Sequence, residues 1–112
     1  MTDKEKIVWL AGLFEGEGYF GLLNNGHGNF YASCYVGLND KDVMQKCVAY
    51  LIEVTDISKI NLLTQKYNNK NHYRIALKGT KAIKVMEILL PYMGKRRSLA
   101  IKNAIKFNGE KK

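Results

Sequence analysis

The spacing of hydrophobic positions changes several times along this chain, between helical patterns and the alternation typical of strands. Residues 3–17 are apolar on nearly every side of a helix, with Thr2 or Asp3 available as its N-cap, which predicts a helix buried on most of its surface. Alternating apolar and polar positions then predict strands at residues 18–23 and 30–38, joined by a turn rich in Asn and Gly. A chain of this size can hardly bury such a helix completely, so part of the helix surface is expected to contact another subunit.

The same analysis of the remainder predicts a second helix and a second pair of strands. The helix runs from Asn39 or Asp40 to about residue 52, and the strands occupy about 59–67 and 72–78. Gly79 precedes a further helix that Pro91 ends or kinks, and a last helix spans about 96–107. The order α-β-β-α-β-β-α-α predicts an α+β fold with a four-stranded antiparallel sheet and its helices on one face.

Length and composition narrow the class of protein. The 112 residues predict one domain, residues 1–107, followed by a polar tail at 108–112. Eighteen Lys and Arg against ten Asp and Glu give a net charge of +8, which favours a polyanionic partner such as nucleic acid. Cys34 and Cys47 have no metal-ligand spacing and are expected to be reduced, buried thiols of an intracellular protein. Neither a signal peptide nor a membrane span is expected.

Residues 9–20 hold the strongest candidate for chemistry. Gly12 and Gly16 lie four residues apart on one helical face, which allows the backbone of another helix to approach closely. Glycine inside a helix costs about 1 kcal/mol relative to alanine, so two of them require a reason. Glu17 falls at the expected helix end, with Gly18 as its C′ residue. A carboxylate at the negative end of the helix dipole is poorly placed for stability but well placed to hold a cation.

This segment resembles the motif of the LAGLIDADG homing endonucleases. Leu10, Ala11, Gly12, Leu13 and Gly18 are identical to the motif, whereas Phe14, Glu15, Gly16 and Glu17 replace its isoleucine, first aspartate, second alanine and second aspartate. Residues 90–97, in which a proline and an aromatic residue lead into Lys95, Arg96 and Arg97, are similar to another segment of that family. The predicted order of elements is also that of the LAGLIDADG endonuclease domain.

The resemblance implies roles for several residues. Glu17 matches the acid that binds the divalent metal, expected to be Mg²⁺, although it could also be a solvated surface glutamate. Either Asn39 or Asp40, depending on the register, matches a polar or acidic active-site position at the junction of strand and helix, and both could equally be plain helix caps. Arg96, then Lys95, is the preferred basic group near the scissile phosphate. Glu15 points about 200° away from Glu17 and is expected to pair with a nearby cation.

Two further sets of residues follow from the predicted elements. The polar face of the sheet is expected to read the major groove of DNA, where donors and acceptors distinguish all four base pairs. Its candidate members are Asn25, Tyr31, Ser33, Tyr35, Asn61, Gln65, Lys66, His72, Arg74 and Lys78. The expected dimer interface consists of Leu10, Gly12, Leu13 and Gly16.

The resulting prediction is a site-specific, metal-dependent endonuclease for double-stranded DNA. One motif per chain implies a homodimer and a pseudo-palindromic target. Two alternatives are a catalytically weak or inactive relative that binds DNA or assists RNA splicing, and a generic basic α+β protein that binds RNA. The coding sequence could belong to an intron, to an intein or to a free-standing gene.

Overall fold

A computed structural model describes residues 1–24 and 26–111 of the chain, and the predicted DNA-contacting residue Asn25 lies outside these residues. The order of elements confirms the α+β prediction, with a short 3₁₀ turn before the last helix. The elements are α1 (Asp3–Glu17), β1 (Gly18–Asn24), β2 (Phe30–Leu38), α2 (Lys41–Val54), β3 (Leu63–Tyr67), β4 (Lys70–Lys78), α3 (Thr80–Leu89), η1 (Leu90–Tyr92) and α4 (Lys95–Phe107).

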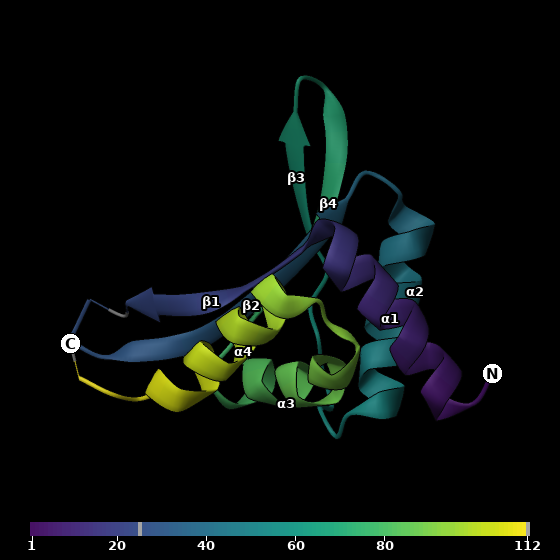
Figure 1. Cartoon of the computed structure of the whole chain (residues 1–112). Helices are drawn as coiled ribbons and strands as arrows, with labels where there is room; N and C mark the ends of the chain where they lie inside the picture. The colour runs from purple at the N-terminus through teal and green to yellow at the C-terminus, as the bar shows by residue number, and fades with distance from the viewer. Residues whose placement is uncertain (25, 112) are drawn as a thin grey trace.

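One antiparallel sheet organises the molecule. Its strand order is β1-β2-β4-β3, so the two hairpins join through β2 and β4. Gly18 pairs with Val36 at the inner end of the first hairpin. The β3–β4 hairpin projects steeply away from the β1–β2 hairpin, which gives the sheet a bent, concave outer surface (Figure 1).

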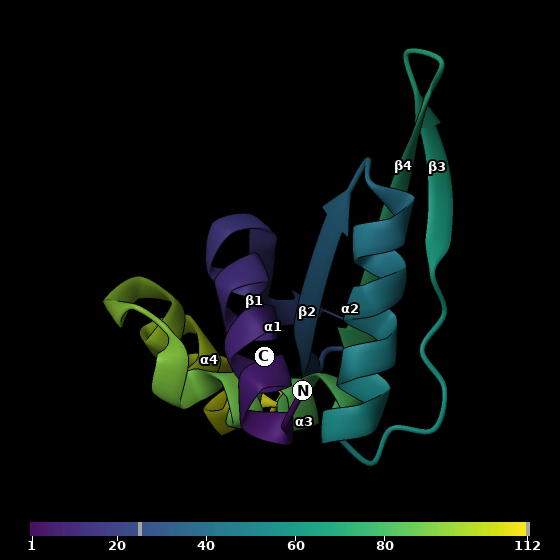
Figure 2. The same cartoon turned by 90° about the vertical axis from the view of Figure 1, so that its right-hand side faces the viewer.

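All four α-helices lie on the other side of the sheet, and their apolar faces form the core with it (Figure 2). Alternation along the strands sends one set of side chains into this core and the other set to the outer face. The largest fully buried side chains come from both layers: Phe14, Leu10, Met44, Leu51, Ile75, Met86, Leu89 and Ile101. The predicted arrangement of helices on one face is therefore confirmed.

The start of α1 agrees with its sequence, whereas its end differs. Thr2 is the N-cap of a capping box, in which its hydroxyl accepts a hydrogen bond from the Glu5 amide and the Glu5 carboxylate accepts one from the Thr2 amide. Gly18 was expected to end the helix as a C′ residue, but its φ of −90° and ψ of 171° are extended. The reason for glycine here is space, because a Cβ would lie 2.8 Å from the carbonyl oxygen of Phe14.

The second hairpin is shorter at its start than predicted. Residues 59–62 are not part of the strand, because Ile57 and Ile60 turn inward and are only 4% and 8% exposed. The turn is a tight one at Asn68 and Asn69, whose φ values of 50° and 65° are accessible to asparagine.

The C-terminal segment is polar, as expected, and is bound to the first hairpin. The Asn108 side-chain oxygen accepts a hydrogen bond from the Ala32 amide at 2.8 Å. The amide of Phe30 donates to the Glu110 carbonyl at 2.9 Å, and the Gly109 amide donates to the Phe30 carbonyl at 2.7 Å. Residues 108–110 therefore brace the beginning of β2.

Both thiols are free and buried, as predicted. Burial raises the pKa of Cys34 and of Cys47 to about 12, and for Cys34 the nearby Cys47 adds to this effect. Within residues 1–24 and 26–111, no helix is long and apolar enough to cross a membrane.

Cys34 and Cys47 should therefore resist thiol reagents in the folded protein. An aromatic disulfide used as the thiol reagent reacts only with the thiolate form of cysteine. A pKa near 12 leaves little thiolate at pH 8. We expect both thiols to react at least about 100-fold more slowly than in denaturant. Rapid modification of either thiol in the native protein would contradict this burial.

Candidate active site and DNA interface

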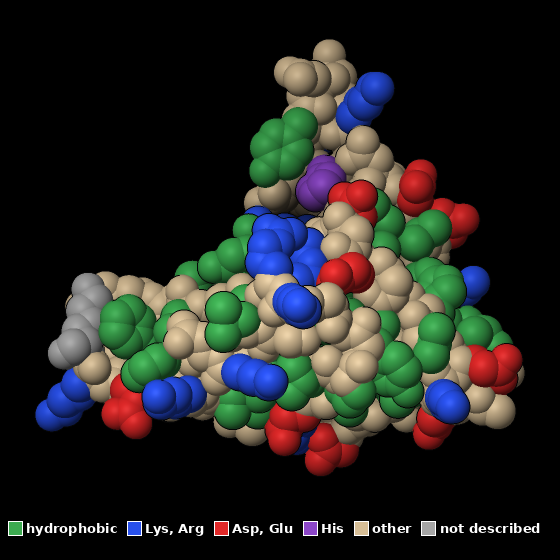
Figure 3. All heavy atoms as spheres, viewed as in Figure 1, with side chains coloured by type: hydrophobic (Ala, Val, Ile, Leu, Met, Phe, Trp, Pro, Cys, Tyr) green, Lys and Arg blue, Asp and Glu red, His purple; other side chains and the backbone are tan. Residues whose placement is uncertain are grey.

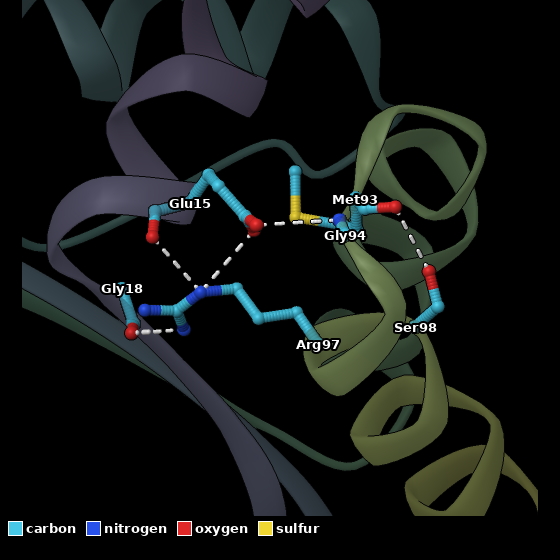
Figure 4. Close-up of polar contacts among 6 residues, drawn as sticks. All are labelled: Glu15, Gly18, Met93, Gly94, Arg97 and Ser98. Atoms are coloured by element: carbon cyan, nitrogen blue, oxygen red, sulfur yellow. Dashed lines mark hydrogen bonds and ion pairs between the residues drawn. The ribbon is translucent and has the colours of Figure 1, made fainter.

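A set of charged contacts joins the C-terminal end of α1 to the N-terminal end of α4 (Figure 4). One carboxylate oxygen of Glu15 accepts a hydrogen bond from the Gly94 amide at 3.2 Å, and the other lies 3.3 Å from Nε of Arg97. Arg97 Nε also donates to the Glu15 carbonyl at 3.0 Å, and Arg97 Nη1 donates to the Gly18 carbonyl. We call these contacts of Glu15 and Arg97 the α1–α4 clamp.

The clamp matches charge to helix polarity at both ends. The Arg97 guanidinium neutralises the carbonyl end of α1, and the Glu15 carboxylate faces the amide end of α4. The Arg97 side chain is only 15% exposed, so these interactions are partly shielded from water. The expected pairing of Glu15 with a nearby cation is thus confirmed.

Glu17, Lys95 and Arg96 remain exposed next to this clamp. Glu17 is the last residue of α1, two positions after Glu15, and Lys95 and Arg96 are the first two residues of α4. Because the clamp ties the two helix ends together, the predicted acid and the predicted bases belong to one region of the surface. Figure 3 shows Lys and Arg side chains gathered at the foot of the β3–β4 hairpin, beside the end of α1.

Asn39 and Asp40 follow the end of β2, at the end of the sheet where α1 leads into β1. Gly18 pairs with Val36, so the chain leaves β2 only a few residues beyond the partner of the residue that follows Glu17. Asp40 occupies the N-cap position of α2, yet its side chain makes no capping hydrogen bond. The Asn39 side-chain oxygen instead lies 3.1 Å from Nδ1 of His72.

The outer face of the sheet carries many of the predicted DNA-contacting side chains. Strand register puts six of them on this face: Tyr31, Tyr35, Gln65, His72, Arg74 and Lys78. Ser33 belongs to the same face but is only 4% exposed, at a hollow of about 300 Å³ that Arg74 and Lys78 also line. Lys66 alternates with Gln65 and therefore points to the opposite face of β3, and Asn61 is exposed in the segment before β3.

Two residues of this region were missed by the sequence analysis. Tyr19 is on the outer face and stacks on Tyr35 with ring centroids 4.8 Å apart, which the alternation of Phe20 with its neighbours in β1 could have indicated. Arg97 was grouped with Lys95 and Arg96, and only the helical phase of about 100° per residue separates its direction from theirs.

The described residues contain no group of three or more His, Cys, Asp or Glu side chains that could hold a metal ion. Glu17 offers the hard carboxylate oxygens that Mg²⁺ and Ca²⁺ prefer. Glu15, the nearest acid in the sequence, already has its carboxylate engaged with Arg97 and the Gly94 amide.

Comparisons with known proteins support the fold alone. Neither protein-family models nor curated proteins match this chain. Among solved structures, the homing endonuclease I-CvuI in complex with its target in the presence of 2 mM Ca is similar to it, with a TM-score of 0.65 and 19% identity, over 94% of this chain and 69% of that one. I-CvuI with an I-CreI target and 2 mM Mg, in which the DNA is not cleaved, gives 0.62 and 19%, over 92% and 69% of the two chains.

A variant of I-DmoI with nicked target DNA and 2 mM Mn is also similar, with a TM-score of 0.56 and 13% identity. That match covers 94% of this chain and 61% of that one. The chain thus has the fold of homing endonucleases whose solved structures contain DNA and a divalent metal.

Replacing Arg97 and Arg96 separately should show that Arg97 stabilises the fold through the clamp, whereas Arg96 does not. Arg97→Ala removes the ion pair and two hydrogen bonds to carbonyl groups, and we expect it to lower the free energy of unfolding by about 2–3 kcal/mol. Arg96→Ala removes an exposed side chain and should change it by less than about 0.5 kcal/mol. Urea denaturation of both variants measures this, and equal effects would contradict the clamp.

Proposed function

We propose that this chain is a site-specific endonuclease for double-stranded DNA, of the homing endonuclease type, which acts as a metal-dependent homodimer. The observation that carries this proposal is the exposed carboxylate of Glu17 at the junction of α1 with the sheet, next to the exposed bases at the start of α4. The DNA complexes of I-CvuI and I-DmoI, which share this fold, support the same substrate class.

In the proposed reaction, Glu17 would hold a divalent cation, which would supply an activated water and stabilise the leaving oxygen. Arg96, with Lys95 beside it, neutralises charge on the scissile phosphate. Asn39 and Asp40 are further polar groups that orient water near this position. Since each chain has one copy of the segment that contains Glu17, cleavage of both strands would use Glu17 from two chains.

The proposed dimer interface is the outer side of α1. A Cβ on Gly12 or Gly16 would have no described atom within 4 Å, so nothing in this part of the chain requires glycine at either position. Val8 is 48% exposed, and hydrophobic side chains are visible over the surface of α1 in Figure 3. Two glycines that weaken a helix and face open space are explained by close approach of another α1, in a face that also includes Leu13. The prediction of Leu10 as an interface residue is wrong, because its side chain is fully buried in the core of its own chain.

This interface predicts opposite effects of one substitution on the single chain and on the dimer. Gly16→Ala should favour helix formation by up to about 1 kcal/mol within each chain. The added methyl group should nevertheless weaken self-association, and Gly16→Leu should weaken it more. Analytical ultracentrifugation at several concentrations, with and without DNA, measures this. A wild-type chain that stays monomeric even on duplex DNA would contradict the proposed interface.

Glu17→Gln tests the chemistry. The substitution keeps size and hydrogen bonding but removes the charge, and the lost stabilisation of several kcal/mol should reduce cleavage more than about 100-fold. DNA affinity and folding should persist, because the sheet supplies the contacts with DNA. Glu15→Gln, the matched control, should lower stability through the α1–α4 clamp and reduce cleavage far less.

A second candidate is a protein of the same fold that binds DNA, or assists RNA splicing, without cleaving. The fold and the basic outer face of the sheet serve this alternative equally well, because neither requires cleavage. Wild-type protein that binds a defined duplex yet does not cleave it with Mg²⁺, Mn²⁺ or Ca²⁺ would establish it. Equal loss of cleavage in the two glutamine variants would mean that Glu17 is not the metal ligand.

A further inference from the structure

A row of flat side chains crosses the outer face of the sheet from β1 to β4. Tyr19 and Tyr35 are cross-strand partners whose rings are nearly parallel, 20° apart, with centroids separated by 4.8 Å. The guanidinium carbon of Arg74 lies 4.7 Å from the centroid of the Tyr35 ring. Tyr35 therefore contacts Tyr19 on β1 and Arg74 on β4.

Small residues leave room for this row. A Cβ at Gly21 would overlap the hydroxyl group of Tyr19, so the ring of Tyr19 leans across the glycine two residues further along β1. Ala76 is the partner of Tyr35 in β4, and its small side chain leaves space above it for Arg74 from two residues before. These small residues and the aromatic rings fix where the guanidinium lies.

Arg74 is held by stacking rather than by hydrogen bonds. Its Nε is buried and has no hydrogen-bond partner in the described part of the chain, and no carboxylate there forms an ion pair with it. A buried, unpaired N–H group is costly and calls for an explanation. Stacking on Tyr35 occupies the flat face of the guanidinium and leaves its edge, with the remaining donors, available to a ligand.

The hollow beside Arg74 supplies a place for such a ligand. It has a volume of about 300 Å³ and is lined by Tyr35, Arg74 and Lys78, among others. Arg74 and Lys78 give the hollow positive charge, and Ser33 gives it a small polar side chain. The edge of the Arg74 guanidinium and the positive charge of Lys78 suit a ligand with two hydrogen-bond acceptors side by side in a negatively charged groove. Guanine presents O6 and N7 in this way in the major groove of DNA.

We propose that Tyr35, supported by Tyr19, is a positioning residue that fixes Arg74 to read one guanine in each half-site of the target duplex. The inference rests on the proposed function in so far as that function requires duplex DNA as the ligand. It goes further by assigning one base pair to one side chain and by giving the two tyrosines a role in specificity.

The experiment is selection of binding sites from a randomised duplex library, followed by affinity measurements on single-base variants of the selected site. Wild-type protein should prefer guanine at one position of each half-site by about tenfold or more. Arg74→Ala should abolish that preference while leaving the preferences at other positions in place. Tyr35→Phe, which keeps the ring, should retain it, and Tyr35→Leu should lose most of it.

Two controls separate this effect from loss of charge or of folding. Lys66→Ala removes the same charge from the opposite face of β3 and should leave the guanine preference unchanged. Thermal unfolding reports whether Tyr35→Leu is folded. If it is not, Tyr19→Leu, one ring further from Arg74, should reduce the preference by a smaller factor and provides the test.

Each result bears on a distinct claim. If Arg74→Ala leaves every base preference of the selected site unchanged, the inference is overturned but the endonuclease proposal remains intact. If Tyr35→Phe and Tyr35→Leu show equal guanine preferences, Tyr35 has no role in positioning Arg74. Sequence-selective binding without cleavage would overturn the nuclease and leave the inference standing. Binding by wild-type protein to single-stranded RNA alone, or to no duplex, would overturn both.

Discussion

The α1–α4 clamp is the interaction on which the candidate active site depends. Glu17 comes from the end of α1 and Lys95 and Arg96 come from the start of α4, almost 80 residues later in the chain. Glu15 and Arg97 join these two helix ends through a charge pair and through hydrogen bonds to the backbone. Each charge also faces the helix end of opposite polarity, so the same groups stabilise both helix termini. The neighbouring charged residues are thereby left exposed in one region.

A second constraint governs the outer face of the sheet. The helices cover one side of β1, β2 and the inner part of β4, so alternate residues of these strands face the open side, where polar and aromatic groups gather. Gly21 and Ala76 make room for Tyr19 and Arg74, and a comparable gap at Gly37 lets His72 lie against Asn39. The contact between Asn39 and His72 thus joins a candidate catalytic residue to the candidate DNA-contacting face. The basic character of the chain is consistent with a polyanion on this surface.

Much of the fold follows from local sequence signals. The N-cap candidates Thr2 and Asp3, the alternation in residues 30–38 and the proline after α3 each predict the observed element. The start of β3 was predicted wrongly because Ile60 fits the local pattern of a strand. In the structure Ile60 packs into the core, but it lies in irregular backbone before β3. Position 18 requires glycine because a Cβ there would overlap Phe14, a steric requirement that a capping pattern does not reveal.

Side-chain pairing between distant segments is harder to predict. Arg96 and Arg97 are identical residues in adjacent positions, and only the three-dimensional arrangement of α1 and α4 separates the partly shielded Arg97 of the clamp from the exposed Arg96. The stacking of Arg74 on Tyr35 likewise depends on strand order, since β2 and β4 are neighbours although a helix and a strand lie between them in the sequence.

The central claim, that each chain supplies one acid and that two chains act on one duplex, is tested most directly with mixed dimers. Wild-type and Glu17→Gln chains carrying different affinity tags would be co-expressed, and the heterodimer isolated and incubated with the target duplex and Mg²⁺. The account predicts that the heterodimer nicks one strand efficiently and leaves the other intact, whereas the wild-type dimer cuts both. Cleavage of both strands by the heterodimer at the wild-type rate would contradict it.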